Sequence, residues 1–269
     1  MASKTPTAMI KNALKRELRS MQTFFPGLRQ AKFDAYNWAT RNLGWRIEPE
    51  FRLLAHLPKC DIAIDVGGNR GQSILALKRC ANPSKIIGFE PNAALASSLA
   101  DNFAGDDTVT IHPIGLGSET GAFQLHIPSY RNFEYDGLAS LDRSSAIEWL
   151  NADRVARFDP SLLKIATHAV KVERLDDFNL TPDVIKIDVQ GLEQAVVQGG
   201  FQTIAQHRPA IIIEAPSHSL IELLKTAGLK SYIVGRGKLH QSNDTHRNNM
   251  FLSDENYGLI SDSLASNSA

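Results

Sequence analysis

The stretch Ile62-Ala63-Ile64-Asp65-Val66-Gly67-Gly68-Asn69-Arg70-Gly71-Gln72-Ser73 decides the fold. It begins as a short apolar run that ends in an acid, continues as a glycine-rich turn, and then takes on a helical period. A strand, a tight loop and a helix in this order are typical of the first unit of a nucleotide-binding α/β domain. Glycine lets the backbone turn sharply and approach a ligand, and the free N–H groups of the helix start point back at that ligand.

The residues of this loop indicate which ligand it suits. A dinucleotide-binding loop has the pattern G-x-G-x-x-G after the strand, but Val66 stands in place of the first glycine. Asp65, just before the turn, would repel a pyrophosphate at close range. A carboxylate suits a ligand with cationic and donor groups, and S-adenosylmethionine (SAM) carries an ammonium, a sulfonium and a ribose. The loop therefore favours SAM and disfavours an NAD-dependent oxidoreductase.

A second acid follows one helix later. Residues 85–90 are another apolar run that ends in a carboxylate, Glu90. An acid at the end of the second strand accepts hydrogen bonds from a ribose diol. Pro91 fits the first position of the next helix, so the alternative is that Glu90 only caps that helix. The two acids together predict a ligand site at the carboxyl ends of the strands.

Four motifs together resemble one family. The runs IDVGGNRGQS, FEPN, VIKIDVQGLEQAVVQGG and IIIE occur in this order, and residues 55–255 are similar to the FkbM family of SAM-dependent methyltransferases. The resemblance implies an α/β fold of the Rossmann-like class I methyltransferase type, with a seven-stranded, mostly parallel sheet and helices on both faces. It also implies SAM as the cofactor. The family often has an acid where Gln190 stands, so one possible metal ligand is missing.

The predicted cofactor site combines the glycine loop, the residues after the second and third strands, and the end of the fourth core strand. The resemblance places the end of the third strand in the adenine pocket, which adds two residues at positions 114 and 115. The predicted cofactor-binding residues are Asp65, Gly67, Gly68, Asn69, Gly71, Ser73, Glu90, Pro91, Asn92, Ile114, Gly115 and Asp188.

The chain alternates strands and helices, which predicts a parallel, doubly wound sheet. A polar and aromatic stretch at residues 128–165 interrupts this alternation, and it is either a substrate gate or a surface excursion. The other elements are placed by their periodicity. Strands are expected at residues 61–66, 85–90, 109–115, 122–127, 169–175, 184–188, 209–214, 229–235 and 249–253, and helices at residues 72–80, 93–103, 144–158, 193–199 and 220–225.

Three parts are predicted along the chain: a helical extension at residues 1–54, the methyltransferase domain at residues 55–255 and a flexible tail at residues 256–269. Residues 9–23 have helical spacing, and residues 1–52 carry ten basic side chains against four acidic ones. This basic helix either contacts a membrane surface or a lipid-linked substrate, or it packs on the domain with a solvated basic face. The resemblance implies that such helices cover the cofactor mouth or mediate a homo-oligomer.

Methyl transfer to a hydroxyl requires a place for the proton. Asp188 and Glu214 end neighbouring strands and could face one cleft, where two carboxylates could hold Mg²⁺. Alternatively, Asp188 or His218 could act as a general base. The predicted catalytic residues are therefore Asp188, Glu214 and His218, and the predicted metal ligands are Asp188 and Glu214.

The amino-acid composition indicates which partners and which cellular compartment to expect. The net charge is zero, so no nucleic-acid partner is expected. The two cysteines, Cys60 and Cys80, lie in apolar contexts without metal-ligand spacing, which indicates a reducing, cytoplasmic location. The leading hypothesis is an enzyme that methylates a hydroxyl of a sugar, a glycan or a glycosylated metabolite. The alternatives are methylation of a non-sugar secondary metabolite on oxygen or nitrogen, and a non-catalytic SAM-binding scaffold.

Overall fold

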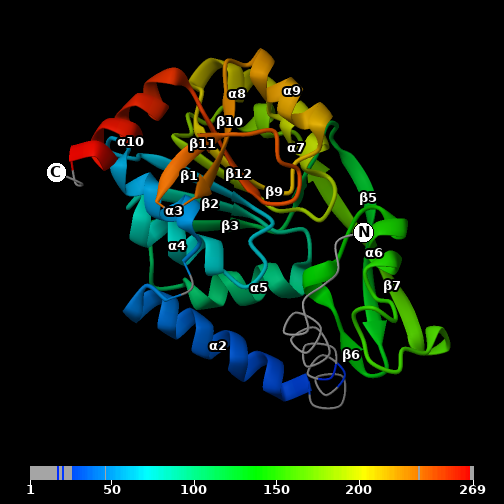
Figure 1. Ribbon diagram of the computed structural model, residues 1–269. Helices are drawn as coiled ribbons and strands as arrows, with labels where there is room; N and C mark the ends of the chain where they lie inside the picture. Colours follow the sequence, from blue (N-terminus) through cyan, green and yellow to red (C-terminus); the bar gives the residue numbers. More distant parts are fainter. Residues whose placement is uncertain (1–16, 18–19, 21–25, 46, 236, 267–269) are drawn as a thin grey trace, which may run out of the picture. The chain divides into compact units, whose positions relative to one another are not determined.

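The computed structural model describes residues 17, 20, 26–45, 47–235 and 237–266 (Figure 1). The chain divides into two compact units: a larger unit with residues 36–123 and 170–269, and a smaller unit with residues 1–35 and 124–169. This division differs from the predicted boundaries at residues 54 and 255. The basic helix predicted at residues 9–23 lies outside the described residues, apart from Glu17 and Ser20.

An eight-stranded sheet forms the larger unit, in the order β11-β10-β12-β9-β8-β1-β2-β3. The strands from β3 to β9 in this order are parallel, β12 is antiparallel to both of its neighbours, and β11 is antiparallel to β10. The strands are β1 (Ile62–Val66), β2 (Lys85–Phe89), β3 (Val109–His112), β8 (Val184–Ile187), β9 (Ala210–Glu214), β10 (Lys230–Gly235), β11 (Lys238–Gln241) and β12 (Asn248–Leu252).

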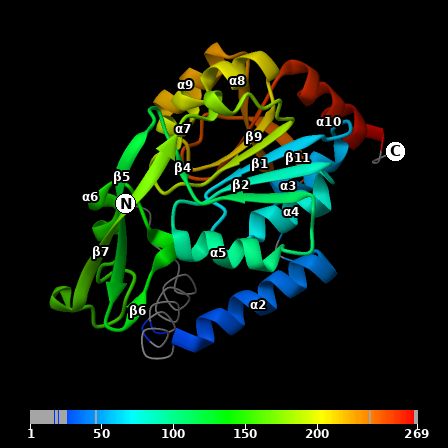
Figure 2. The same cartoon turned by 180° about the vertical axis from the view of Figure 1, so that it is seen from behind.

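Helices cover both faces of this sheet (Figures 1 and 2). The apolar clusters on the two faces show which helices pack where. One face carries α3 (Pro49–Leu53), the short η1 (Leu54–His56), α4 (Gln72–Cys80), α5 (Ala93–Asn102) and α10 (Asp254–Ser266). The other face carries α7 (Glu193–Gly199), α8 (Phe201–His207) and α9 (His218–Thr226).

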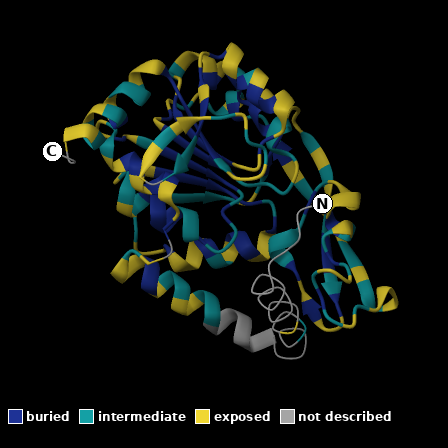
Figure 3. Ribbon diagram, in the orientation of Figure 1, coloured by how far each residue is buried: buried dark blue, intermediate teal, exposed yellow. Residues whose placement is uncertain are grey.

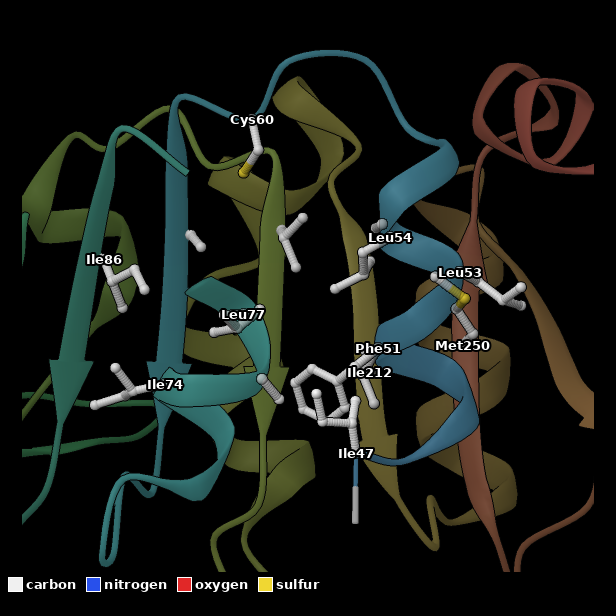
Figure 4. Close-up of a cluster of buried hydrophobic side chains, with 14 of the residues drawn as sticks. Ile47, Phe51, Leu53, Leu54, Cys60, Ile74, Leu77, Ile86, Ile212 and Met250 are labelled. Atoms are coloured by element: carbon white, nitrogen blue, oxygen red, sulfur yellow. The ribbon is translucent and has the colours of Figure 1, made fainter. Parts of the chain in front are cut away.

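The central strands are buried on both faces because helices cover both (Figure 3). That is why they read as continuous apolar runs rather than as alternating patterns. In the core on the α4 face, Phe51 and Leu54 pack with Leu77, Ile212 and Met250 (Figure 4). Each such side chain contributes about 1.5–3 kcal/mol on burial. This packing holds the carboxyl ends of the strands, where the predicted site lies, in a rigid frame.

Two predictions at the carboxyl-terminal end of the chain need correction. The sheet has eight strands rather than seven, because β11 was missed. That strand, with the sequence KLHQ, has a single apolar residue and lies at the sheet edge, so no apolar pattern marks it. The flexible tail predicted from residue 256 is also wrong for the described residues, which form α10 up to Ser266, with Ile260 fully buried.

The third strand ends earlier than predicted. Strand β3 stops at His112, and residues Gly115–Leu116 form β4, which belongs to a second sheet of order β4-β7-β5-β6. The aromatic contact of His112 with Phe89, with ring centroids 5.2 Å apart, gives this histidine a packing role. Ile114 and Gly115 therefore do not extend β3, although the prediction placed them at its end.

The smaller unit has its own core. It contains β6 (Phe133–Glu134), α6 (Arg143–Glu148) and parts of β5 (Gly121–Tyr130) and β7 (Leu163–Glu173), strands that contribute residues to both units. Its buried cluster consists of Tyr130, Phe133, Tyr135, Leu150 and Val155. The helix predicted at residues 144–158 is confirmed only for its first turns, since the chain continues as turns after α6. The apolar residues of that stretch are buried without a regular helix.

Helix α2 (Pro26–Leu43) lies within the helical extension predicted for residues 1–54 and contributes residues to both units. Cys60 is buried and Cys80 half-buried, both as free thiols. In the described part of the chain, no helix combines the length and the apolar character that crossing a membrane requires.

Candidate active site

The glycine loop between β1 and α4 depends on two glycines. Gly67 has φ of 84°, and a Cβ added there would lie 1.9 Å from the backbone oxygen of Asp188. Gly71 caps α4 with φ of 85°. L-residues rarely adopt this left-handed conformation. The loop therefore passes close against the end of β8, and only glycine at position 67 leaves room for that approach.

Asp65 lies directly before this loop and is fully buried. The Ser73 hydroxyl donates a 2.7 Å hydrogen bond to its Oδ2, and its Oδ1 has no hydrogen-bond partner among the described residues. Burial raises the pKa of Asp65 to about 6, against the opposing effects of Ser73 and Lys186. A buried acceptor without a partner costs free energy, so this oxygen fits a ligand that brings a donor.

Glu90 follows β2 and is 6% exposed. Its Oε2 accepts a hydrogen bond from the Asn69 backbone N–H, and its Oε1 accepts one from the Asn92 N–H, both at 2.9 Å. The carboxylate thus joins the glycine loop to the start of α5. A carboxylate is an acceptor-only group, and its place beside the glycine loop suits the hydroxyls of a ribose. A backbone-held acid beside the glycine loop is the arrangement predicted from the sequence.

The structure also shows the contacts of the other predicted cofactor residues. The Asn92 side chain accepts hydrogen bonds from two backbone N–H groups and caps α5. A Cβ on Gly115 would lie 3.5 Å from the Cβ of Pro91, so these two residues are close together. Ile114 packs against the apolar cluster on the α7 face. The backbone of Gly68 lies over Asp65, since a Cβ there would be 3.4 Å from Oδ2.

Two acids lie at the ends of the next strands. Asp188 follows β8, and its Oδ1 accepts a 2.9 Å hydrogen bond from the Gln190 amide. Glu214 is the exposed last residue of β9. The pKa of Glu214 is raised mainly by desolvation of its carboxyl and, to a smaller extent, by repulsion from Asp188. Lys186 acts in the opposite direction. The predicted pairing of Asp188 with Glu214 is therefore present, as two interacting carboxyls.

The sequence analysis missed Lys186, which lies in the middle of β8. Its side chain is 6% exposed, its Nζ donates to the Ile187 carbonyl at 3.3 Å, and it lies 4.0 Å from Asp188 Oδ2. A lysine is rarely buried unless it is paired. The signal was present in the sequence, because the run Val184-Ile185-Lys186-Ile187 places a charge inside an apolar strand.

Two acids from the segment before and within α3 also belong to this region and were missed. Glu50 is 7% exposed, and its burial raises its pKa, while Lys186 acts in the opposite direction. Glu48 accepts a 2.7 Å hydrogen bond from Asn248 at the start of β12. No sequence signal joins these residues to β8, because they are more than a hundred positions away and only the packing of α3 brings them there.

The structure does not support the predicted metal site. The described residues contain no group of three or more histidine, cysteine or carboxylate side chains that could hold a metal ion. Asp188 lies instead beside the amine of Lys186. His218 is the exposed first residue of α9 and makes no hydrogen bond or ion pair within the described part of the chain. Glu193 accepts hydrogen bonds from the backbone of Val189 and Gly191, so it supports the loop after β8.

The strand order, with antiparallel β12 beside β9 and buried acids at the carboxyl ends of β1 and β2, defines a Rossmann-like fold of the class I methyltransferase type. Residues 65–257 match the Methyltransferase FkbM domain, and the chain belongs to this family.

Two curated proteins and a crystal structure illustrate the relationship. The chain is 29% identical over 164 residues to "Methyltransferase 1" of Beauveria bassiana, covering 54% of this chain and 61% of that protein. It is 25% identical over 170 residues to the 2-O-methyltransferase NoeI of Sinorhizobium fredii, covering 58% and 65%. A methyltransferase FkbM from Methylobacillus flagellatus aligns with a TM-score of 0.45 at 16% identity, covering 76% and 50%. The chain thus spans less than two thirds of the length of these proteins.

Proposed function

We propose that the protein is a SAM-dependent methyltransferase that methylates a hydroxyl of a sugar, a glycan or a glycosylated metabolite. The observation that carries the proposal is the buried pair Asp65 and Glu90 on either side of a glycine loop that closes against β8. The family match supports methyl transfer. The similarity to a 2-O-methyltransferase supports oxygen as the methylated atom.

The two buried acids divide the work of binding the cofactor. The unpartnered oxygen of Asp65 fits the amino group of the methionyl part, and Glu90 fits the ribose hydroxyls. A carboxylate at each place matches cationic and donor groups and would oppose a pyrophosphate. When bound, SAM supplies an electrophilic methyl group, so the protein's main task is to position the acceptor oxygen.

We assign to Asp188 the role of accepting the proton from the substrate hydroxyl. Its carboxylate is one-third exposed, so a substrate can reach it, while Gln190 and Lys186 hold its two oxygens in place. Glu214 beside it has a raised pKa and can share a proton with it. His218 has no contact that would orient it in the described part of the chain. The pair of carboxyls therefore replaces both the histidine base and the Mg²⁺ of the sequence-based hypothesis.

The test is isothermal titration calorimetry with S-adenosylhomocysteine (SAH). Wild-type protein should bind it, and Asp65→Ala and Glu90→Ala should each lose binding. Asp61→Ala is the matched control, because Asp61 is an exposed acid just before β1 that pairs with Lys59. No binding by the wild-type protein would overturn the proposal, and a nicotinamide fluorescence titration would then test the oxidoreductase alternative.

A screen with labelled SAM then identifies the acceptor. Sugars and polysaccharides, glycosylated metabolites and non-sugar metabolites form its three arms, each with and without Mg²⁺. Methylation of a sugar hydroxyl supports the proposal, whereas methylation only in the third arm favours the secondary-metabolite alternative. SAH binding without any transfer would favour a scaffold. The proposal includes the class of acceptor and a cytoplasmic location. It also includes a contact of the N-terminal helix, either with a membrane or with a second copy of the chain.

A further inference from the structure

Buried Lys186 lies beside Asp65, the proposed cofactor acid, and beside Asp188 and Glu214, the acids proposed for the acceptor. Strands β1 and β8 are parallel neighbours, and Lys186 is the register partner of Asp65. On its other side, Lys186 is the register partner of Ile212 in β9. Because side chains alternate along a strand, positions 188 and 214 lie on the same face as Lys186, one step nearer the carboxyl edge. The sheet therefore aligns an amine with carboxyls from three strands.

The charges around this amine are unbalanced. The groups that face it are Asp65 from β1, Asp188 after β8, Glu214 from β9 and Glu50 from α3, and Glu48 adds a further negative charge beside Glu50 and Glu214. For Asp65, Glu50 and Glu214, Lys186 is the one cationic side chain among the described residues that favours ionisation. One amine faces four carboxyls, so this region accumulates negative charge.

A charged residue at this position has a high energetic cost. Burying an ammonium costs several kcal/mol unless its partners offset that cost. A strand between two others could hold isoleucine instead, as positions 185 and 187 do. The amine lies 4.0 Å from Asp188 Oδ2, close enough for the two charges to attract each other. Lys186 is therefore stabilised by these acids, and its loss would leave them to repel one another.

We propose that Lys186 is a positioning residue that couples the cofactor acid Asp65 to Glu214 beside Asp188, so that filling the cofactor site changes the protonation of Glu214. The inference rests on the proposed function, since it takes SAM as the ligand beside Asp65. A ligand that brings positive charge stabilises ionised carboxyls. Protons then leave the acids for the solvent, and the acceptor site is prepared when the methyl donor is in place.

The wild-type protein provides the first test. Titration of SAM near pH 6, in buffers with different ionisation enthalpies, measures the protons released on binding. We expect release of a measurable fraction of a proton, and less release in Asp65→Asn. Binding without any proton release would overturn the proposal. Absence of SAM and SAH binding would instead refute the proposed function, so the two failures are distinguishable.

Variants of Lys186 provide the second test. The affinity for SAM should rise with pH as Asp65 ionises, because the burial-raised pKa of that acid lies near 6. Lys186→Met removes the nearby positive charge, so the midpoint of this profile should move up by about one pH unit, a loss of about tenfold in affinity below the midpoint. Lys186→Arg should restore the midpoint. Lys85→Met, at an exposed lysine that begins β2, is the control and should change nothing.

The combined variant Lys186→Met with Glu50→Gln separates folding from coupling. It removes one positive and one negative charge, so it should unfold at a higher temperature than Lys186→Met alone. If Lys186→Met does not fold, the pH dependence of SAM affinity is measured with this double variant instead. A folded variant without Lys186 whose midpoint equals that of the wild-type protein would overturn the proposal, because a merely structural lysine would leave the midpoint in place.

Discussion

The acids at the carboxyl ends of β1 and β2 differ from the acids at the carboxyl ends of β8 and β9, although the four strands are neighbours in the sheet. Asp65 and Glu90 are buried, and neighbouring backbone and hydroxyl groups hold three of their four oxygens. Asp188 is one-third exposed, and Glu214 is exposed; the two repel each other beside Lys186. In the proposed function, the first pair holds the cofactor in one pose. The second pair is accessible and electrostatically coupled, as proton transfer requires.

The largest effect is expected where the two pairs meet, at Gly67. In Gly67→Ala the new Cβ would lie 1.9 Å from the Asp188 carbonyl, in a left-handed conformation that disfavours alanine. The loop must move away from β8, so we expect SAH binding to be lost and stability to fall by about 3 kcal/mol. Calorimetry and urea unfolding measure both changes. Gly105→Ala is the control, because nothing lies within 4 Å of its Cβ position; equal losses there would contradict the explanation.

Asp188→Asn should separate the two pairs. Loss of the proton acceptor should slow methyl transfer by about 10²- to 10⁴-fold, while SAH affinity stays within about threefold, because Asp65 and Glu90 are unchanged. Initial rates with labelled SAM and calorimetry give the two values. Glu214→Gln should cost less, about tenfold in rate. A variant of Asp188 that loses SAH binding as much as activity would place this acid with the cofactor pair.

Asp65→Asn should weaken binding and stabilise the free protein. Loss of a charge-assisted contact should reduce SAM affinity by about 10- to 100-fold. Burial raises the pKa of Asp65 from 3.8 to about 6, so the folded state binds the proton more tightly than the unfolded state. Stability is therefore lost as pH rises from about 4 to about 6, by about 3 kcal/mol for this group.

The asparagine variant lacks that ionisation, so its melting temperature should exceed that of the wild-type protein at pH 8 and equal it near pH 4. Thermal unfolding at the two pH values measures the difference. Asp61→Asn, at an exposed acid before the same strand, is the control for the change of residue type. A melting-temperature difference that does not depend on pH would contradict the burial argument.

Asn92→Ala should have a smaller effect, on stability rather than on binding. Its side chain caps α5, and loss of such a cap costs about 1 kcal/mol. Asn92→Asp keeps the cap and should keep the stability, as urea unfolding would show. A large loss of SAH affinity in Asn92→Ala, with stability unchanged, would restore the sequence-based assignment of this residue to the cofactor.

The smallest effect is expected for His218→Ala. This side chain is exposed at the start of α9, and Ser217 caps that helix. We expect the activation free energy of methyl transfer and the free energy of unfolding each to change by less than about 0.5 kcal/mol. A large drop in rate, measured beside Asp188→Asn, would return the role of general base to this histidine.

The positions of Asp65 and Glu90 at strand ends beside the glycine loop could be predicted from the sequence because their signal is local. The apolar run that ends in Asp65, just before Gly67, predicts both a strand and the place where it ends. The apolar run before Glu90 shows the same pattern. The metal hypothesis for Asp188 and Glu214 rested on the neighbouring ends of two strands, and that proximity is present in the structure. What the hypothesis lacked was the amine of Lys186, which already supplies a positive charge beside Asp188.

The sequence by itself determined the family, the main strands along the chain and the acids beside the glycine loop, because apolar periods and glycine turns act over a few residues. Only the tertiary structure decided what surrounds each acid. Burial set the pKa of Asp65, and the packing of α3 brought Glu50 to Lys186 from a distant part of the chain. Desolvation and charge interactions depend on distances in space, and a linear pattern of residues does not contain those distances.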